Sequence, residues 1–173
     1  KNVTVTDAKD TVTLDNAKGN VTVTDATQDK NIIINDGANV TVTATSAVNN
    51  GGITIGGTNG LNTGNATGDV VVTSNLNGAD AVTLTGAAIN VTGGKTVNVT
   101  VNATSAETTD DTTVSTTNQS AINVTADNTT TSVTVKQTAS VTGSDAVTAV
   151  AGVNEVSTIK FVTLANTAAV TID

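Results

Sequence analysis

The sequence predicts an all-β protein, a parallel β-solenoid of short strands rich in threonine and valine, and three observations support this prediction. Threonine alternates with valine, isoleucine or leucine from one end of the chain to the other. The segment VTVTDAKD at residues 3–10 returns as VTVTDATQD at residues 21–29. Clusters of asparagine, aspartate and glycine separate the alternating blocks. Because strand side chains point to opposite faces in turn, each block buries its aliphatic residues and exposes a row of threonines.

The N-terminal segment, residues 1–40, defines the repeat. Each VTVTDA copy is followed by a second strand-like segment, first TVTLDNAKGN at residues 11–20 and then NIIINDGAN at residues 31–39. One unit is therefore two strands in roughly 18 to 20 residues, a length within the range of solenoid coils.

Further strands are expected along the rest of the chain. The spacing between them is not constant, so the repeat is degenerate, and glycines such as Gly93 and Gly94 supply the positive φ angles that corners need. The expected strands lie at residues 40–43, 53–55, 70–73, 82–85, 89–92, 97–101, 122–125, 133–135, 141–142, 159–164 and 170–172.

Two stretches interrupt the pattern. Residues 105–120, SAETTDDTTVSTTNQS, are polar and acidic, which predicts a surface insertion or a module boundary. The chain then divides into a β-repeat region at 1–102, the insertion or boundary at 103–120, and a second β-repeat region at 121–173. Residues 144–157 are rich in alanine and valine and begin with a potential N-cap serine, which predicts a short helix.

An antiparallel Ig-like β-sandwich is the alternative fold. In that arrangement VTLDNAKGNVTV at residues 12–23 is a hairpin with a polar turn. The echo at the start of the chain favours the solenoid instead, because a hairpin does not require two unlike strands to recur in the same order.

Charge and composition exclude several classes of function. The net charge is −8 with a sequence pI near 4.1, and the basic residues are all lysine, so the surface repels nucleic acid and anionic membranes. No segment approaches the roughly 18 apolar residues that cross a bilayer. Without histidine or cysteine the chain lacks Ser–His and Cys–His pairs, and its one aromatic residue, Phe161, lies in an apolar segment typical of a core. We expect no enzymatic activity and no small-molecule substrate.

Calcium is the candidate ligand, because aspartates close successive strands of the repeat and stacked coils would bring their oxygens together. In the alternative interpretation the same aspartates cap turns through bonds to the backbone, with nearby lysines neutralising them. The candidate ligands are Asp7, Asp15, Asp25 and Asp36, with Asp10 and Asp29 in the adjoining corners and Lys9, Lys18 and Lys30 close in sequence.

Triplets of the form Thr-x-Thr, such as those at residues 4–6, 22–24 and 41–43, resemble the outward threonine ranks of solenoid ice-binding proteins. A flat array requires constant coil length, and the drift in spacing argues against one. The threonines are therefore interpreted as the polar face of half-buried strands.

The two ends of the pattern are expected to continue into further structure. Val3 and Ile172 lie close to the two ends of the chain, with no capping element outside either. We expect each end to be followed by more of a parent chain or by a neighbouring copy. The first residue is Lys1 rather than methionine, which is typical of a mature product or an excised segment.

The VTVTDA and VTLT blocks, and above all TTTSVTVKQTASVTGSDAVTAVAGVNEVSTIKFVTL at residues 129–164, resemble the β-strand repeat regions of bacterial surface-layer proteins and giant adhesins exported by type I secretion. The resemblance implies an extracellular structural module at the bacterial cell surface that self-associates into a homo-oligomeric lattice or filament, often with calcium. The alternative is a stalk or spacer of a large secreted adhesin that serves biofilm formation or ice binding. The glycine-rich calcium nonapeptide typical of such proteins is absent.

Overall fold

The computed structural model describes residues 1–47, 49–57, 64–79, 83–107, 116–143, 153–155, 159–163 and 168–173. These residues form an all-β structure of three parallel sheets without a helix. The antiparallel Ig-like sandwich is the wrong alternative for this part of the chain, because every strand pairing in it is parallel. Each strand pairs with its equivalent one circuit later, where the same aliphatic residues recur, and not with a hairpin neighbour.

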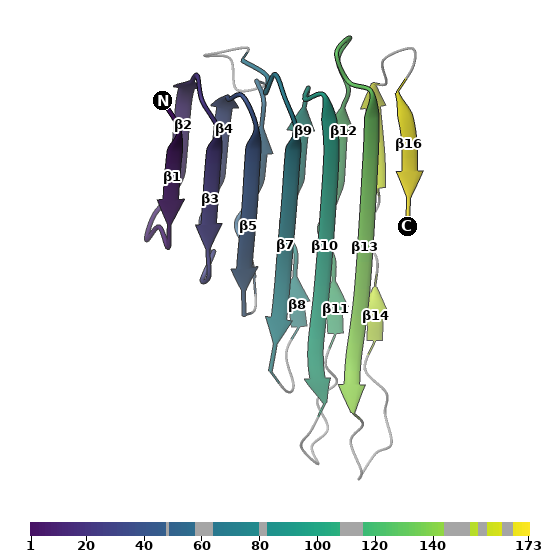
Figure 1. Ribbon diagram of the computed structural model, residues 1–173. Coiled ribbons are helices and arrows are strands. Elements are labelled where there is room, and N and C mark those ends of the chain that lie inside the picture. The colour runs from purple at the N-terminus through teal and green to yellow at the C-terminus, as the bar shows by residue number, and fades with distance from the viewer. Residues whose placement is uncertain are drawn as a thin grey trace.

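The largest sheet, sheet A, runs along the front of the molecule in Figure 1. Its strands, in spatial order, are β1 (Val3–Thr6), β3 (Val21–Asp25), β5 (Val40–Ser46), β7 (Val70–Gly78), β10 (Thr96–Glu107), β13 (Ser132–Gly143) and β16 (Ala169–Ile172). They lengthen from 4 residues in β1 to 12 in β10 and β13, so the molecule widens along the stack.

Two further sheets lie behind sheet A (Figure 1). Sheet B consists of β2 (Val12–Ala17), β4 (Ile32–Asp36), β6 (Ile53–Ile55), β9 (Ile89–Thr92), β12 (Ile122–Thr125) and β15 (Ile159–Thr163). Sheet C consists of β8 (Thr83–Thr85), β11 (Thr116–Asn118) and β14 (Val153–Glu155).

The chain visits the sheets in a repeating order. The strands β1 to β6 alternate between sheets A and B, and from β7 onward a strand of sheet C lies between each strand of A and the next strand of B. Val3 pairs with Val21 and Val21 with Val40, so the first two circuits take 18 and 19 residues. Val97 pairs with Val133, a circuit of 36 residues. The expected unit of roughly 18 to 20 residues therefore holds for the first two circuits only. The next circuit, from Val40 to Val70, takes 30 residues, and the circuits from β7 onward also build sheet C.

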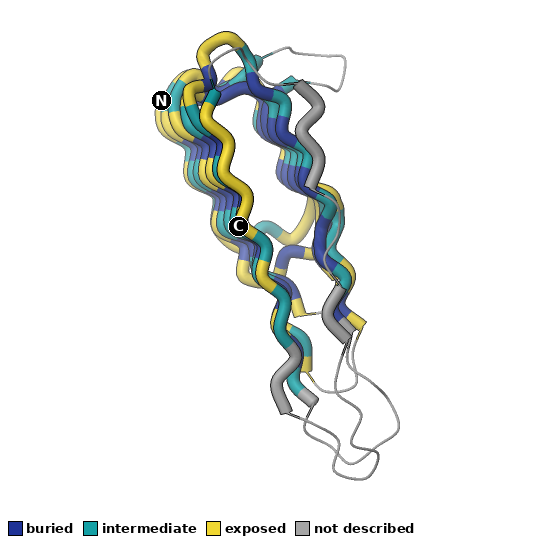
Figure 2. Tube along the Cα trace, turned by 90° about the vertical axis from the view of Figure 1, so that its right-hand side faces the viewer, coloured by how far each residue is buried: buried dark blue, intermediate teal, exposed yellow. Residues whose placement is uncertain are grey.

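Aliphatic columns fill the space between the sheets, and Figure 2 views the molecule after a quarter turn, with the strands of each sheet nearly eclipsed. Valine lines sheet A and isoleucine lines most of sheet B, and both belong to one buried cluster. Burying each such side chain stabilises the fold by about 1.5–3 kcal/mol. The first inward column of sheet A contains Val21, Val40, Val70, Val97 and Val133, and that of sheet B contains Ile32, Ile53, Ile89 and Ile122.

Polar side chains hold successive circuits together at the start of sheet A. Asn2 Oδ1 accepts a hydrogen bond from the backbone N–H of Asn20 at 3.0 Å, and Asn20 Oδ1 accepts one from the N–H of Asn39 at 3.3 Å. Asn39 Oδ1 in turn accepts one from the N–H of Asp69 at 2.8 Å. The residue before each of the first three valine-rich strands is therefore asparagine because its amide bonds to the next circuit.

Some sequence predictions fall wholly or partly outside the described residues. Of the predicted helix at 144–157, residues 144–152 and 156–157 lie outside the described residues. For residues 153–155 the helix prediction is wrong, since Val153–Glu155 forms β14, which pairs with β11. Of the predicted insertion at 103–120, residues 103–107 continue β10 and Thr116–Asn118 form β11, while 108–115 lie outside. The division into three regions stays a prediction.

Candidate functional site

The four aspartates predicted to bind calcium lie in two sheets. Asp7 follows β1 and Asp25 ends β3, at equivalent positions because Thr6 pairs with Thr24. Asp15 and Asp36 belong to β2 and β4 of sheet B. In Figure 1 the strands of sheet A point downward and those of sheet B upward, so the carboxyl ends of the two sets lie at opposite edges.

Each of these carboxylates has a contact with a neighbouring group. Asp7 Oδ1 accepts a hydrogen bond from the N–H of Ala26 at 3.0 Å. Asp25, which is buried, accepts one from the N–H of Thr27 at 3.1 Å. Asp15 Oδ1 accepts one from Asn35 Nδ2 at 2.6 Å, and Lys18 Nζ lies 3.8 Å from Asp36 Oδ2.

These contacts are the ones expected if the aspartates stabilise turns and neighbouring circuits. Within the described residues, no group of three or more acidic, histidine or cysteine side chains is placed to hold a metal ion. Calcium binding through Asp7, Asp15, Asp25 and Asp36 remains a prediction.

A separate aspartate, Asp127, organises the turn between β12 and β13. Its Oδ1 accepts hydrogen bonds from the N–H and Oγ1 of Thr129, at 2.8 and 2.7 Å, and its Oδ2 accepts one from Asn65 Nδ2 at 3.1 Å. Partial burial raises the pKa of Asp127, but the hydrogen bonds from Thr129, Asn65 and Thr130 together outweigh it, so the pKa lies below the ordinary aspartate value.

Buried amides cross the interior where the first circuits turn from sheet A to sheet B. Gln28 is fully buried, and its Nε2 donates to the carbonyls of Lys30 and Gly51, at 2.9 and 2.8 Å. Asn50 Nδ2 donates to Ser74 Oγ at 2.9 Å, and Asn50 Oδ1 accepts from the N–H of Ala87 at 2.6 Å. Sequence reasoning missed these residues, because nothing distinguishes a buried Asn or Gln from an exposed one in a chain where such corners are common.

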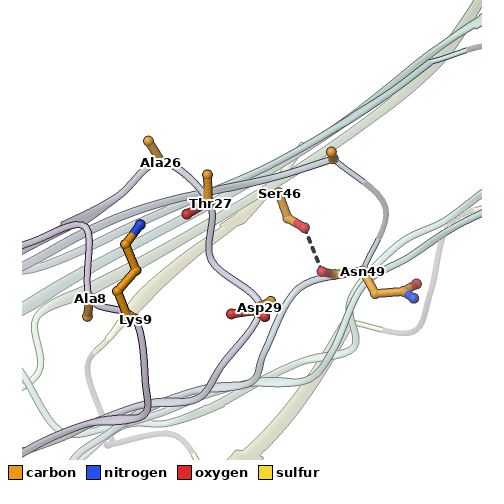
Figure 3. Close-up of a pocket in the computed structure, with 8 residues that line it drawn as sticks. Ala8, Lys9, Ala26, Thr27, Asp29, Ser46 and Asn49 are labelled. Carbon is orange, nitrogen blue, oxygen red and sulfur yellow. Dashed lines mark hydrogen bonds between the residues drawn. The ribbon is translucent and has the colours of Figure 1, made fainter.

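A shallow hollow of about 550 Å³ lies at the same corner of the first three circuits (Figure 3). Its described lining is small and mixed in charge, and Ser46 Oγ donates to the carbonyl of Asn49 at 2.5 Å. The lining residues are Ala8, Lys9, Ala26, Thr27, Asp29, Ser46, Ala47 and Asn49. The charged residues of this lining are Lys9 and Asp29, one cation and one anion, so the lining contains no pair of acidic side chains.

The outer face of sheet A carries aligned side chains among which threonine predominates. We call its first two outward ranks the threonine face. The first rank contains Thr4, Thr22, Thr41, Val71, Asn98, Thr134 and Thr171, and the second contains Thr6, Thr24, Thr43, Thr73, Thr100 and Lys136. The pairing of these residues runs through all seven strands without a register shift.

The drift in spacing along the sequence therefore does not shift the register of these outward positions. Circuits of 18 and of 36 residues keep the same register in sheet A. The additional residues are accommodated in sheet C and the corners, and the outward ranks are unaffected.

Within the described residues, the strands at both ends of the stack each have one unpaired edge. There β1 and β2 pair only with β3 and β4, and β16 pairs only with β13. Val170 and Ile172, which continue the inward columns of sheet A, are 38% and 55% exposed. Aliphatic columns and a backbone ladder thus reach the last described strand without a cover.

Comparisons with protein-family models, with curated proteins and with solved structures gave no match to this chain. The part of the chain that the structure describes holds no helix of the length and apolarity that a membrane crossing needs.

Proposed function

We propose that this chain is a structural module of an extracellular bacterial protein, wound as a parallel β-solenoid, which self-assembles into a surface layer or filament. The observation that carries the proposal is the continuous ladder of sheet A, which runs in register from β1 to β16, with one edge of each of these two strands unpaired among the described residues. The cell-surface location rests on the resemblance of the strand repeats to surface-layer and adhesin regions.

The solenoid path is supported by the order of the strands. Sheets A and B alternate along the chain, sheet C enters at one fixed place in the later circuits, and equivalent residues stack at each step. In such an array each circuit contacts only its neighbours, so stability accumulates along the stack and no compact core or catalytic pocket is required.

Self-association is supported by the chemistry of the open edges. An unpaired strand is a template for another strand, and natural proteins usually block it with charge, proline or a covering element. The described strand β1 reads VTVT and the described strand β16 reads AVTI, with no charged or proline residue in either. Each edge can therefore accept a parallel strand in the same valine register.

Negative-stain microscopy of the purified chain, with and without millimolar calcium, tests this proposal. We expect ordered sheets or filaments. Thr4→Pro is the informative variant. The N–H groups of Val3 and Asp7 donate to the carbonyls of Asn20 and Thr24 on the side of β3, so the alternation of ladder bonds points the N–H of Thr4 to the unpaired edge.

Thr4→Pro should prevent growth without breaking the β1–β3 ladder, and Thr4→Ala, which keeps the N–H, should assemble normally. Dispersed single particles for the unmodified chain in both buffers would count against self-assembly and would favour the alternative, a stalk of a secreted adhesin. Calcium binding is part of the same proposal. A melting temperature of the chain that does not change at millimolar calcium would contradict calcium binding.

A further inference from the structure

The two end strands of sheet A share their inward columns. Val3 and Val170 belong to one column and Val5 and Ile172 to the next, because the pairing runs in register through all the described strands of the sheet. Each end strand has four residues. We call the unpaired edge of β1 the β1 tip and the unpaired edge of β16 the β16 tip. The two tips are therefore matched in length and nearly in lateral position.

The β16 tip exposes apolar side chains that one more strand would cover. Val170 and Ile172 are 38% and 55% exposed, whereas Val133 and Val135, which precede them in the same columns, are buried. Figure 2 looks onto this tip, with the exposed strand β16 in front. The two valines of β1 are also only partly buried, although they pack against the core. A contact between the two tips would remove apolar surface of both from water.

The backbone groups of the two tips are complementary. At the β1 tip, the alternation of ladder bonds directs the N–H and carbonyl groups of the outward residues Thr4 and Thr6 to the unpaired edge. At the β16 tip, the N–H groups of the outward residues Ala169 and Asp173 donate to carbonyls of β13 and its preceding residue. The inward residues of β16 therefore direct their N–H and carbonyl groups to the unpaired edge. Outward residues bond at one tip and inward residues at the other, as on the two sides of a pairing inside the sheet.

One register satisfies these groups and the apolar columns together. With Val170 level with Val3, the bonding groups of Val170 and Ile172 lie on either side of Thr4. The described strands β3 and β5 are arranged in the same way, because their valines lie level while the N–H of one donates to the residue before the other. A slip by one residue would place bonding groups level with each other and turn threonine inward.

We infer that copies of this chain join head to tail, with β16 of one copy paired in parallel with β1 of the next, and grow into a polar filament. This inference rests on the proposed self-assembly and names the surface that each copy uses. The strands of sheet A follow one another in one direction across the molecule (Figure 1), so each added copy lengthens the stack and no ring closes. Seven described strands at about 4.8 Å give an axial repeat of about 34 Å.

The junction between copies is weaker than a pairing inside the chain. Among the described strands, sheet B has six and sheet A has seven, so sheet A alone is continuous across the junction. An amide bond between circuits is also missing there, because Ala169 precedes Val170 where Asn2 precedes Val3 and accepts from the N–H of Asn20. Filament growth should therefore depend on protein concentration.

Two variants that each block one tip test the polarity. Thr4→Pro removes a donor from the β1 tip, and Ile172→Pro removes one from the β16 tip without breaking the ladder between β13 and β16. The unmodified chain should form filaments with the repeat of about 34 Å in electron micrographs. Each variant alone should stay monomeric in size-exclusion chromatography with light scattering. An equimolar mixture of the two should form dimers, because one open tip of each kind remains.

A third variant should strengthen the junction. Ala169→Asn places an amide oxygen where it can accept from the N–H of Asn2 in the next copy, as Asn2 accepts from Asn20 within the chain. One net hydrogen bond should lower the concentration needed for filament growth by roughly fivefold. Ala169→Leu, which is similar in shape and lacks the amide, is the matched control and should not reproduce this effect.

Circular dichroism establishes that the variants fold, and Thr6→Pro and Val170→Pro block the same two tips if the first pair does not. Dimers of either blocked variant alone would overturn the inference, because like tips would then pair. A mixture that stays monomeric while the unmodified chain assembles would also overturn it, and self-assembly would then use another surface. An unmodified chain that stays dispersed would overturn self-assembly and the inference together.

Discussion

Replacing Ile34 with alanine tests the assignment of inner and outer faces on which the whole fold depends. Ile34 is fully buried in β4, between Leu14 of β2 and Ile55 of β6, whereas the adjacent Ile33 faces outward and is half-buried. The substitution removes three buried carbons, worth about 2.4 kcal/mol at roughly 0.8 kcal/mol each. With the cavity left behind, the free energy of unfolding should fall by about 2–5 kcal/mol.

Ile33→Ala is the matched control, because it removes the same atoms from the next residue of the same strand. It should lower the free energy of unfolding by about 1 kcal/mol or less, the range of strand preference at a partly exposed position. Urea unfolding followed by circular dichroism measures both losses, and hydrogen exchange in β2, β4 and β6 locates them. Equal losses, or a larger loss for Ile33→Ala, would refute the face assignment.

Three further predictions concern the corners. Gly56 has φ +83°, and a Cβ there would collide with a backbone carbonyl of the neighbouring strand, so Gly56→Ala should lower the free energy of unfolding by more than about 1 kcal/mol in a thermal melt. Gly52→Ala is the control, because the nearest atom is 3.4 Å from the added Cβ, and it should melt like the unmodified chain. Asn50→Ala should lower the free energy of unfolding by about 1–3 kcal/mol, because it leaves the N–H of Ala87 without its acceptor. If hydrogen exchange of the Ala87 amide is the same in the variant, Asn50 is not its acceptor. The pKa of Asp127 is lowered in the folded state, so its carboxylate contributes stability that is complete above the ordinary aspartate pKa and lost as the pH falls below about 4. In Asp127→Ala the free energy of unfolding should therefore fall less steeply with decreasing pH on the acid side, and an unchanged pH dependence would exclude this role.

Most of the strands were predictable from the sequence because alternation is a local property, whereas β11 and β14 of sheet C were not predicted. The blocks at residues 3–6, 21–24 and 122–125 all form strands with the aliphatic residues inward. The parallel arrangement followed from the recurrence of two unlike strands in a fixed order near the N-terminus. The prediction of a helix at 144–157 was wrong where the structure describes it, because pairing with β11 outweighs the helical preference of an alanine-rich segment.

The candidate sites were less predictable, because each depends on which circuits become neighbours. The four aspartates were grouped by their place at strand ends, but the sheets run in opposite directions and separate them into pairs. The buried amides of Gln28 and Asn50 could not be recognised, since their burial depends on a corner formed with a later circuit.

The sequence by itself determined most of the strands of sheets A and B, which of their side chains face inward, and that the chain is acidic and lacks histidine and cysteine. These features depend on composition and on a two-residue period that each segment carries alone. Only the tertiary structure decided the length of each circuit, the existence of sheet C and the alignment of the outward residues of sheet A, most of them threonine, into two ranks in register. Register is set by pairing between residues far apart in the chain, and variable corners can absorb inserted residues while the backbone ladder stays in step.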